Sequence, residues 1–298
     1  MRKFLALLVL TVSSLPALAV VNVFATVPEW GALAGEIGGE QVKVYTATTA
    51  LQDPHRIEAR PSLLAQARRA QLLIATGAEL EAGWLPVVQQ ESGNPAIQTG
   101  RPGYFEAAVF VTRLESVQVA DRAHGDVHLG GNPHIHLDPR NILKVAQALG
   151  TRLAELDPAN AAVYQRRLAA FTTRWQAAMA RWEQAAQPLR GVAVVVHHKS
   201  FTYLAQWLGL KETGALEPKP GIEPTSGHLT ALLRQQQAQP ARLVIRAAYQ
   251  QAAASRWFAE KAGIQAVMLP FTVGGSPEAG DLFGLFDDTI QRLLRGLR

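Results

Sequence analysis

The chain has 298 residues, of which 48% are hydrophobic and 18% charged, and it contains no cysteine. This length predicts about two packed domains, and the composition excludes a disordered chain and a membrane-embedded bundle. The formal net charge is +5, but no dense block of lysine and arginine is present, so no nucleic-acid partner is expected. Without cysteine, any metal site must use histidine and carboxylate ligands.

The first nineteen residues have the pattern of a secretory signal peptide. Arg2 and Lys3 precede an apolar run over residues 4–10, and Ala17 and Ala19 supply the small residues of a cleavage site. We expect cleavage after Ala19, which lowers the formal charge from +5 to +3. An uncleaved anchor is the alternative, although no second long apolar run follows. The pattern therefore predicts a soluble, exported protein.

Short strand-like runs alternate with helical patterns along both halves of the chain. Near-continuous apolar runs of this kind are typical of parallel sheets that helices cover on both faces. We therefore predict an α/β protein of two lobes, each built on a mainly parallel sheet. The predicted strands are residues 20–26, 42–48, 71–76 and 107–112 in the first half, and 192–197, 242–247 and 265–270 in the second.

A long helical segment separates the two halves. Asp157 as N-cap, Pro158 at the first helical position and Pro188 at the end bound a stretch without internal glycine or proline. It can form one helix of about 29 residues, roughly 43 Å long. Its apolar stripe predicts a stiff connector packed along both lobes, with a helix inside one lobe as the alternative. The predicted parts are a signal peptide (1–19), an N-terminal lobe (20–156), the connecting helix (157–189) and a C-terminal lobe (190–298).

Two groups of histidines follow predicted strands, where open parallel sheets place their ligands. His55 lies in the loop between a strand and a helix that begins near Pro61. His198 ends the strand at 192–197 together with His197, and adjacent strand residues face opposite sides. We expect His198 to point into the crevice and His197 to be packed or hydrogen-bonded.

A third group lies in NPHIHLDP, just before a helix that Asp138 and Pro139 open as N-cap and first residue. His134 and His136 face the same side if this piece is extended, so spacing alone does not choose between them. A fold that gathers the three loops would bring three imidazoles together. Imidazoles, with at most a carboxylate, form the ligand set of Zn(II), with Cu(II) and Ni(II) as competitors and Mn(II) or Ca(II) less suited.

Four segments carry a resemblance to a known family. They are DPHRIE (53–58), NPHIHLDP (132–139), HKSFTYL (198–204) and GIEPTSGHL (221–229). In this order they resemble the signature segments of the cluster A-I substrate-binding proteins of ABC importers, the ZnuA-like family that binds zinc or manganese. The resemblance runs from about residue 21 to the end of the chain. It implies two α/β lobes joined by one long helix, with the metal between them, in a periplasmic monomer.

The resemblance also implies a ligand set. The family's three ligand positions match His55, His134 and His198, and histidine at the third position favours zinc, since manganese-preferring members commonly have glutamate there. Leu269 stands where many relatives have an aspartate as fourth ligand. Asp281 is the nearest substitute, and its alternative role is the N-cap of the last helix.

The remaining histidines have weaker assignments. His136, where many relatives have tryptophan, is expected to be an auxiliary donor. His124 and His128 lie where zinc-binding relatives often carry a histidine-rich loop, and they either capture metal or have no role. His228 is expected at the surface or beside a helix cap.

The expected function is high-affinity capture of Zn(II) in the periplasm and delivery to the permease of an ABC importer in the inner membrane, without enzymatic activity. The alternatives are a family member for manganese or another metal, and a periplasmic metallochaperone or adhesin. A zinc hydrolase would need a general base such as Glu58 or Asp281, and the chain has no H-E-x-x-H motif.

Overall fold

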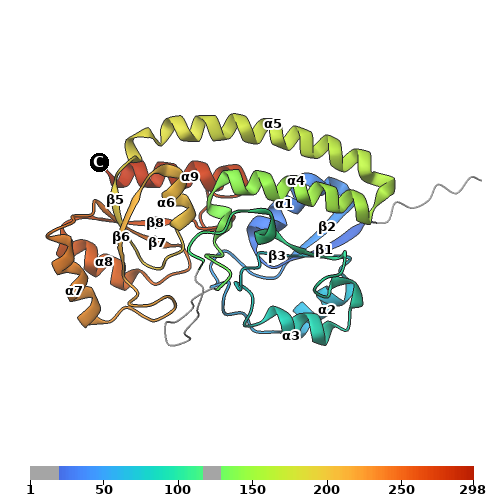
Figure 1. The fold of residues 1–298 in the computed structure, drawn as a ribbon, viewed down its shortest axis with the longest axis horizontal. Coiled ribbons are helices and arrows are strands. Elements are labelled where there is room, and N and C mark those ends of the chain that lie inside the picture. Colours follow the sequence, from blue (N-terminus) through green and yellow to red (C-terminus); the bar gives the residue numbers. More distant parts are fainter. Residues whose placement is uncertain (1–19, 117–128) are drawn as a thin grey trace, which may run out of the picture.

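The computed structural model describes residues 20–116 and 129–298, so the predicted signal peptide, His124 and His128 lie outside the described residues. It contains two lobes, each with a four-stranded sheet (Figure 1). The strand orders are β2-β1-β3-β4 and β6-β5-β7-β8, and every neighbouring pair runs parallel. The predicted α/β class with two parallel-sheet lobes is confirmed.

The N-terminal lobe buries its sheet between helices. Apolar side chains such as Phe24, Leu33 and Ile74 are almost fully buried, as a sheet covered on both faces requires. Its elements are β1 (Val21–Ala25), α1 (Pro28–Gly38), β2 (Val42–Thr46), α2 (Pro61–Arg69), β3 (Leu72–Ala75), α3 (Leu85–Ser92), β4 (Tyr104–Glu106) and α4 (Pro139–Leu156).

The C-terminal lobe repeats the arrangement. Val195 and Val244 in its central strands are fully buried. Its elements are β5 (Ala193–Val196), α6 (Thr202–Leu208), β6 (Lys211–Ala215), α7 (Ser226–Gln236), β7 (Leu243–Ala247), α8 (Ala252–Ala262), β8 (Gln265–Leu269) and α9 (Leu282–Gly296).

One strand assigned from the sequence is wrong, and one strand was missed. The strand predicted at 107–112 is Tyr104–Glu106, and Ala107–Phe110 forms a 3₁₀ turn in which Val109 is 63% exposed. The apolar residues of this segment therefore form a turn whose outer side chains lie in solvent, and not a buried strand. Strand β6, with the sequence KETGA, was not predicted because it is polar. It pairs only with β5 at the sheet edge, where no continuous apolar run is needed.

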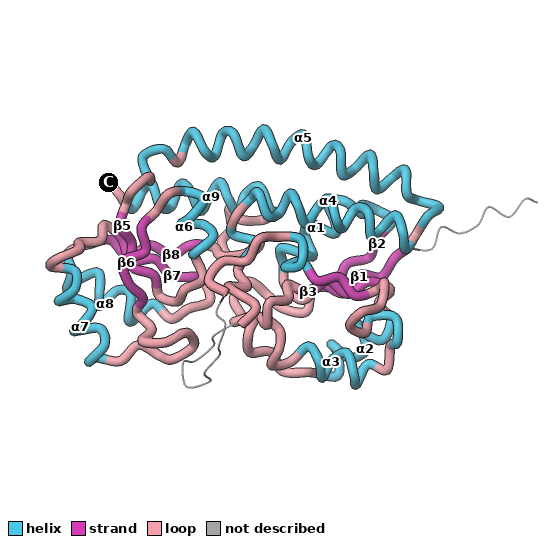
Figure 2. The backbone as a smooth tube through the Cα atoms, in the orientation of Figure 1, coloured by secondary structure: helices cyan, strands magenta, loops and turns pink. Residues whose placement is uncertain are grey.

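The long helix that joins the lobes is α5 (Ala161–Ala185), drawn as one continuous cyan coil in Figure 2. Its 25 residues make it shorter than predicted, about 38 Å. The chain breaks between helices because Pro158–Asn160 forms a separate 3₁₀ turn. Asp157 does not cap α5 with its side chain; its carboxylate accepts a hydrogen bond from the Tyr164 hydroxyl at 2.7 Å.

Helix α5 lies across both lobes (Figure 1) and contacts α1 and α4 on one side of the boundary and α9 on the other. The predicted stripe is buried at Tyr164, Phe171, Trp175 and Trp182. The Trp182 indole donates to Asp287 of α9 at 2.6 Å, so the connector is bonded to the C-terminal lobe as well as packed on it. The helix therefore packs along both lobes, as predicted.

No helix in residues 20–116 or 129–298 has the length and apolar character needed to cross a membrane.

Trp175, in helix α5, provides a test of how much this connecting helix contributes to stability. Its indole is fully buried and donates to the Pro139 carbonyl at the start of α4 at 2.8 Å. The substitution Trp175→Phe removes that bond and part of the ring volume, so we expect the free energy of unfolding in urea to fall by about 1–3 kcal/mol. The control Trp257→Phe, at a residue 37% exposed, should change it by less than about 0.5 kcal/mol. Equal effects of the two substitutions would contradict this role.

Candidate metal centre

Each of the three histidines that the sequence matches to ligand positions lies in a loop at the boundary between the lobes. His55 lies between β2 and α2, and His198 lies between β5 and α6. His134 directly precedes the 3₁₀ turn Ile135–Leu137 that leads into α4. Asp138 caps α4 by accepting from the Arg140 amide at 2.9 Å, which fixes the chain just after His134.

The three imidazole rings meet at this boundary. One ring nitrogen of each lies within 4.8 Å of the others. Ring centroids are 5.3 Å apart for His55 and His134, 5.8 Å for His55 and His198, and 5.7 Å for His134 and His198, with planes 70° to 82° apart. A tetrahedral Zn(II) about 2.0–2.1 Å from each nitrogen needs those nitrogens roughly 3.3 Å apart. Small side-chain rotations would bring the three rings to that geometry.

Two carboxylates orient two of the rings. The Nδ1 of His55 lies 2.8 Å from Oδ1 of Asp53, and the Nδ1 of His198 lies 2.6 Å from Oε2 of Glu217. An ionised carboxylate only accepts hydrogen bonds, so each Nδ1 carries the proton and donates it. The Nε2 atom of each ring then carries the lone pair that would bind a metal, which is the usual arrangement of a histidine ligand held by a carboxylate.

The ionisation of Asp53 supports this tautomer. Burial alone would raise the pKa of Asp53, but hydrogen bonds and Coulomb attraction from His55, with a further Coulomb contribution from His198, bring the pKa below its ordinary value. Asp53 is therefore a carboxylate at neutral pH and accepts the His55 proton.

The third ring is positioned through its backbone. The His134 amide donates to Oδ1 of Asn132 at 3.0 Å, and Nδ2 of the same Asn132 donates to the Lys199 carbonyl at 2.7 Å. Because Lys199 follows His198 in the chain, one buried asparagine joins the His134 loop of one lobe to the His198 loop of the other. The Tyr203 hydroxyl completes this contact by donating to the Asn132 carbonyl at 2.8 Å.

A cavity of about 170 Å³ opens beside His55 and His198. Asp53, Glu217 and Glu223 line it, so three carboxylates surround the approach to the rings. A concave site with one sign of charge concentrates counter-ions, and this sign favours cations. The space is large enough to admit water that could complete a coordination sphere.

Comparison with known proteins places this geometry in a family. A family described as "Zinc-uptake complex component A periplasmic" matches residues 23–296. The chain belongs to this family. A high-affinity zinc uptake system protein ZnuA of Yersinia pestis is 26% identical over 192 residues, 59% of each chain. The manganese ABC transporter substrate-binding lipoprotein PsaA of Streptococcus pneumoniae is 24% identical over 204 residues, which span 66% of this chain and 62% of that protein. The alignments thus cover less than two thirds of these relatives' lengths.

Solved structures of the same type share the fold over nearly the whole chain. A crystal structure of ZnuA superposes with a TM-score of 0.77 at 23% identity, covering 94% of this chain and 100% of that one. The substrate-binding protein FpvC from Pseudomonas aeruginosa, in complex with Mn²⁺, superposes with a TM-score of 0.75 at 19% identity, covering 93% and 98%. At such identities the likeness establishes the two-lobed fold of the zinc-uptake family and no detail of the site.

The structure does not bring Asp281 to the histidine cluster. Its carboxylate accepts from the Gly284 amide at 2.7 Å and caps α9, which is the alternative role considered from the sequence. Leu269, which the resemblance matches to a fourth-ligand position, is fully buried at the end of β8. Among the described residues, the group of candidate ligands contains only the three histidines.

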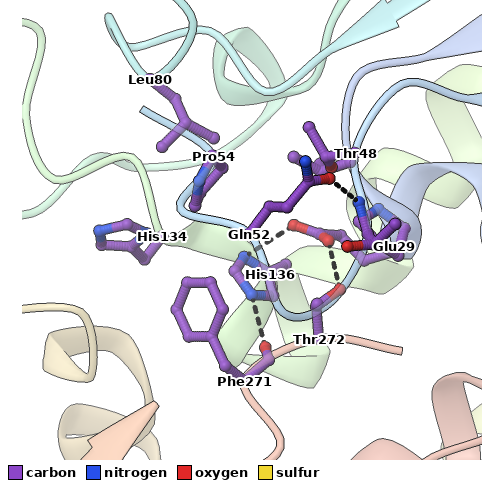
Figure 3. Close-up of a pocket in the computed structure, with 12 residues that line it drawn as sticks. Glu29, Thr48, Gln52, Pro54, Leu80, His134, His136, Phe271 and Thr272 are labelled. Carbon is purple, nitrogen blue, oxygen red and sulfur yellow. Dashed lines mark hydrogen bonds and ion pairs between the residues drawn. The ribbon is translucent and has the colours of Figure 1, made fainter. Parts of the chain in front are cut away.

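His136 is not a member of the cluster. Figure 3 shows its ring with interactions to Glu29 and Phe271. Its Nε2 donates to the Phe271 carbonyl at 2.9 Å, and its Nδ1 lies 3.1 Å from Oε1 of Glu29. Both nitrogens therefore face other groups. The auxiliary metal role expected for His136, like that of His124 and His128 outside the described residues, stays a prediction.

The two other histidines have structural roles. His197 is buried beside the cavity, where burial lowers its pKa against the opposing influence of Glu217 and Glu223. It is therefore a neutral, packed side chain, as expected from the sequence. The Nε2 of His228 lies 2.9 Å from the Ala215 carbonyl and holds the end of β6 against the start of α7.

The two orienting carboxylates had no role predicted from the sequence. Asp53 had a local signal, because an aspartate two residues before a loop histidine can reach its ring. Glu217 had none, since it lies 19 residues from His198 on the far side of α6 and β6. Only the packed lobe brings that pair together.

Glu217 allows the orienting role to be tested. Replacing it as Glu217→Gln keeps the size but removes the charged acceptor that fixes the His198 tautomer, so Zn(II) affinity should fall about 10- to 100-fold in competition titrations. Glu223→Gln removes the same charge from the same cavity and should have a much smaller effect. An equal loss in both variants would show that cavity charge, and not ring orientation, determines the affinity.

Proposed function

We propose that the protein captures Zn(II) in the periplasm and delivers it to the permease of an ABC-type importer. The observation that carries the proposal is the cluster of His55, His134 and His198, whose ring nitrogens lie within 4.8 Å of one another. The proposal is also supported by the hydrogen bonds of Asp53 with His55 and of Glu217 with His198, which orient both rings as ligands. Membership in a family described as the periplasmic component of a zinc-uptake complex supports the same conclusion.

Zinc is the proposed cargo because of the donor set. Among the described residues the cluster holds three imidazoles and no oxygen donor, and this set matches Zn(II), which accepts nitrogen ligands in tetrahedral geometry. Mn(II) prefers carboxylate, carbonyl and water ligands, so a cluster of this composition should bind it more weakly. A manganese- or other-metal-binding member of the family is the alternative, since PsaA is named for manganese and FpvC was solved with Mn²⁺.

Capture from scarce supply requires nanomolar affinity, on the order of −12 kcal/mol, yet the ion must also be released. His55 and His134 belong to the N-terminal lobe and His198 to the C-terminal lobe. A displacement of one lobe relative to the other would therefore remove His198 from its partners. We propose that docking of the monomeric protein on its permease causes such a displacement.

Two other readings share part of this site. A periplasmic metallochaperone or adhesin would use the same three histidines, and genes for a permease and an ATPase beside this one would favour the importer. A zinc hydrolase would need a base near the bound ion. Glu58 is exposed and Asp281 caps α9, and neither lines the cavity beside His55 and His198. The arrangement therefore favours a binding protein.

Metal titration of the ligand-free protein tests the proposal directly. Zn(II) should bind with one high-affinity site per chain, and Mn(II) at least about 100-fold more weakly. His55→Ala, His134→Ala and His198→Ala should each raise the Kd for Zn(II) by about 100-fold or more, because each removes one of three ligands.

The variant Asp281→Ala serves as the matched control for these three. It should lose some helix stability but keep the wild-type affinity for Zn(II), because its carboxylate caps α9. Unchanged affinity in all three histidine variants would reject the proposed site. A large loss in Asp281→Ala would restore that residue as the fourth ligand.

A further inference from the structure

A second set of buried polar contacts crosses the lobe boundary beside the histidine cluster (Figure 3). The Thr272 hydroxyl donates to Oε2 of Glu29 at 2.6 Å, and Nε2 of His136 donates to the Phe271 carbonyl at 2.9 Å. Nδ1 of His136 faces the other Glu29 oxygen at 3.1 Å. Glu29 begins α1 and His136 precedes α4, whereas Phe271 and Thr272 follow β8, so two of the three contacts join the lobes.

These groups are almost completely removed from solvent. Glu29 and His136 are each 2% exposed, and Phe271 and Thr272 are each 4% exposed. A buried carboxylate and a buried imidazole are stable only while their partners remain in place. Separation of the lobes at this point would leave Glu29 without its hydroxyl donor and His136 without its carbonyl acceptor. The two interlobe hydrogen bonds therefore oppose separation of the lobes, which requires both of them to break.

The backbone at Phe271 is strained. Its φ is +68°, in the left-handed region that disfavours a side chain, and the Thr272 amide donates to the Pro270 carbonyl at 2.8 Å. A hydrogen bond from residue 272 back to residue 270, with a positive φ at the residue between them, has the form of the rare γ-turn. Gly275 makes room for it, because a Cβ there would lie 1.8 Å from the Pro270 oxygen. Such a conformation persists only where surrounding contacts hold it.

The strained turn places an aromatic ring against a candidate ligand. The Phe271 ring lies 5.4 Å from the His134 ring and 5.1 Å from the His136 ring, both edge-on. Tyr249 supports it from the C-terminal lobe at 5.2 Å. One side of His134 is therefore packed against an apolar ring from the opposite lobe, and the position of that ring depends on the bond from His136 to the Phe271 carbonyl.

We infer that Glu29, His136, Phe271 and Thr272 form an interlobe latch that sets how slowly the bound metal leaves. The latch holds the lobes together and fixes the His134 ring through Phe271, so its members are positioning residues and not ligands. The inference rests on the proposed function, since it concerns release of the captured ion. It assigns the slow step of release to the breaking of the two interlobe hydrogen bonds.

Thr272→Val tests the latch with little change in shape, because it removes the hydroxyl that donates to Glu29. Thr48→Val is the matched control: its buried hydroxyl donates to the Thr26 carbonyl at 2.9 Å, inside the N-terminal lobe. The mature protein would be loaded with one equivalent of Zn(II) and mixed with excess chelator in a stopped-flow instrument. The dissociation rate should rise about tenfold in Thr272→Val, which is 1.4 kcal/mol of lost retention, and stay within about twofold of wild type in Thr48→Val.

Two substitutions at His136 separate positioning from general destabilisation. His136→Leu removes both interactions and should release Zn(II) at least as fast as Thr272→Val. His136→Gln retains an amide donor at the reach of Nε2 and should restore part of the slow release. Association rates should stay near the wild-type value in all variants, because the three ligand histidines remain.

Equal release rates in folded Thr272→Val, His136→Leu and wild-type protein would overturn the latch while leaving zinc binding intact. Equally fast release from Thr48→Val would also overturn it, because loss of any buried hydroxyl would then suffice. A wild-type protein that binds no Zn(II) would instead reject the proposed function, and the latch with it.

Discussion

Two carboxylate–imidazole hydrogen bonds are the interactions on which the metal centre depends. Asp53 fixes His55 in one lobe at 2.8 Å, and Glu217 fixes His198 in the other at 2.6 Å. Each lobe thus presents a ring with a defined tautomer before the metal arrives. Because the ligands need no rearrangement of their protons, less binding energy is lost in ordering the site. The third ring, His134, is set by its backbone and by neighbouring side chains.

The same carboxylates explain how a cluster of neutral ligands can hold a divalent cation. In the proposed centre, Asp53 and Glu217 would lie one ring away from the ion and supply negative charge without becoming oxygen ligands. The nitrogen donors determine which metal fits, and the carboxylates compensate its charge. The division of the proposed ligands between two lobes on the α5 spine would make binding reversible, since a displacement of one lobe would break the site.

The sequence was informative where one segment carries the signal alone. Buried apolar strands predicted the α/β class. His55 and His198 were candidates from their loops, and the choice of His134 over His136 came from the resemblance of NPHIHLDP to a family segment; the structure brings these three rings together. The sequence was insufficient where tertiary contacts decide. Three features have no local sequence pattern. They are the polar edge strand β6, the hydrogen bond between His198 and Glu217, and the positive φ of Phe271. Asp281 fitted two roles in the sequence, ligand or helix cap, and the structure shows its carboxylate accepting a hydrogen bond from the Gly284 amide.

X-ray absorption spectroscopy of the Zn(II)-loaded protein would measure the ligand set itself. A three-histidine centre requires three imidazole nitrogens at about 2.0–2.1 Å and one further light atom from water, in a four-coordinate site. Outer-sphere scattering should show three imidazole rings in the wild-type protein and two in His198→Ala. A spectrum with two or fewer imidazoles in the wild-type protein, or with a carboxylate as a principal ligand, would contradict the three-histidine centre.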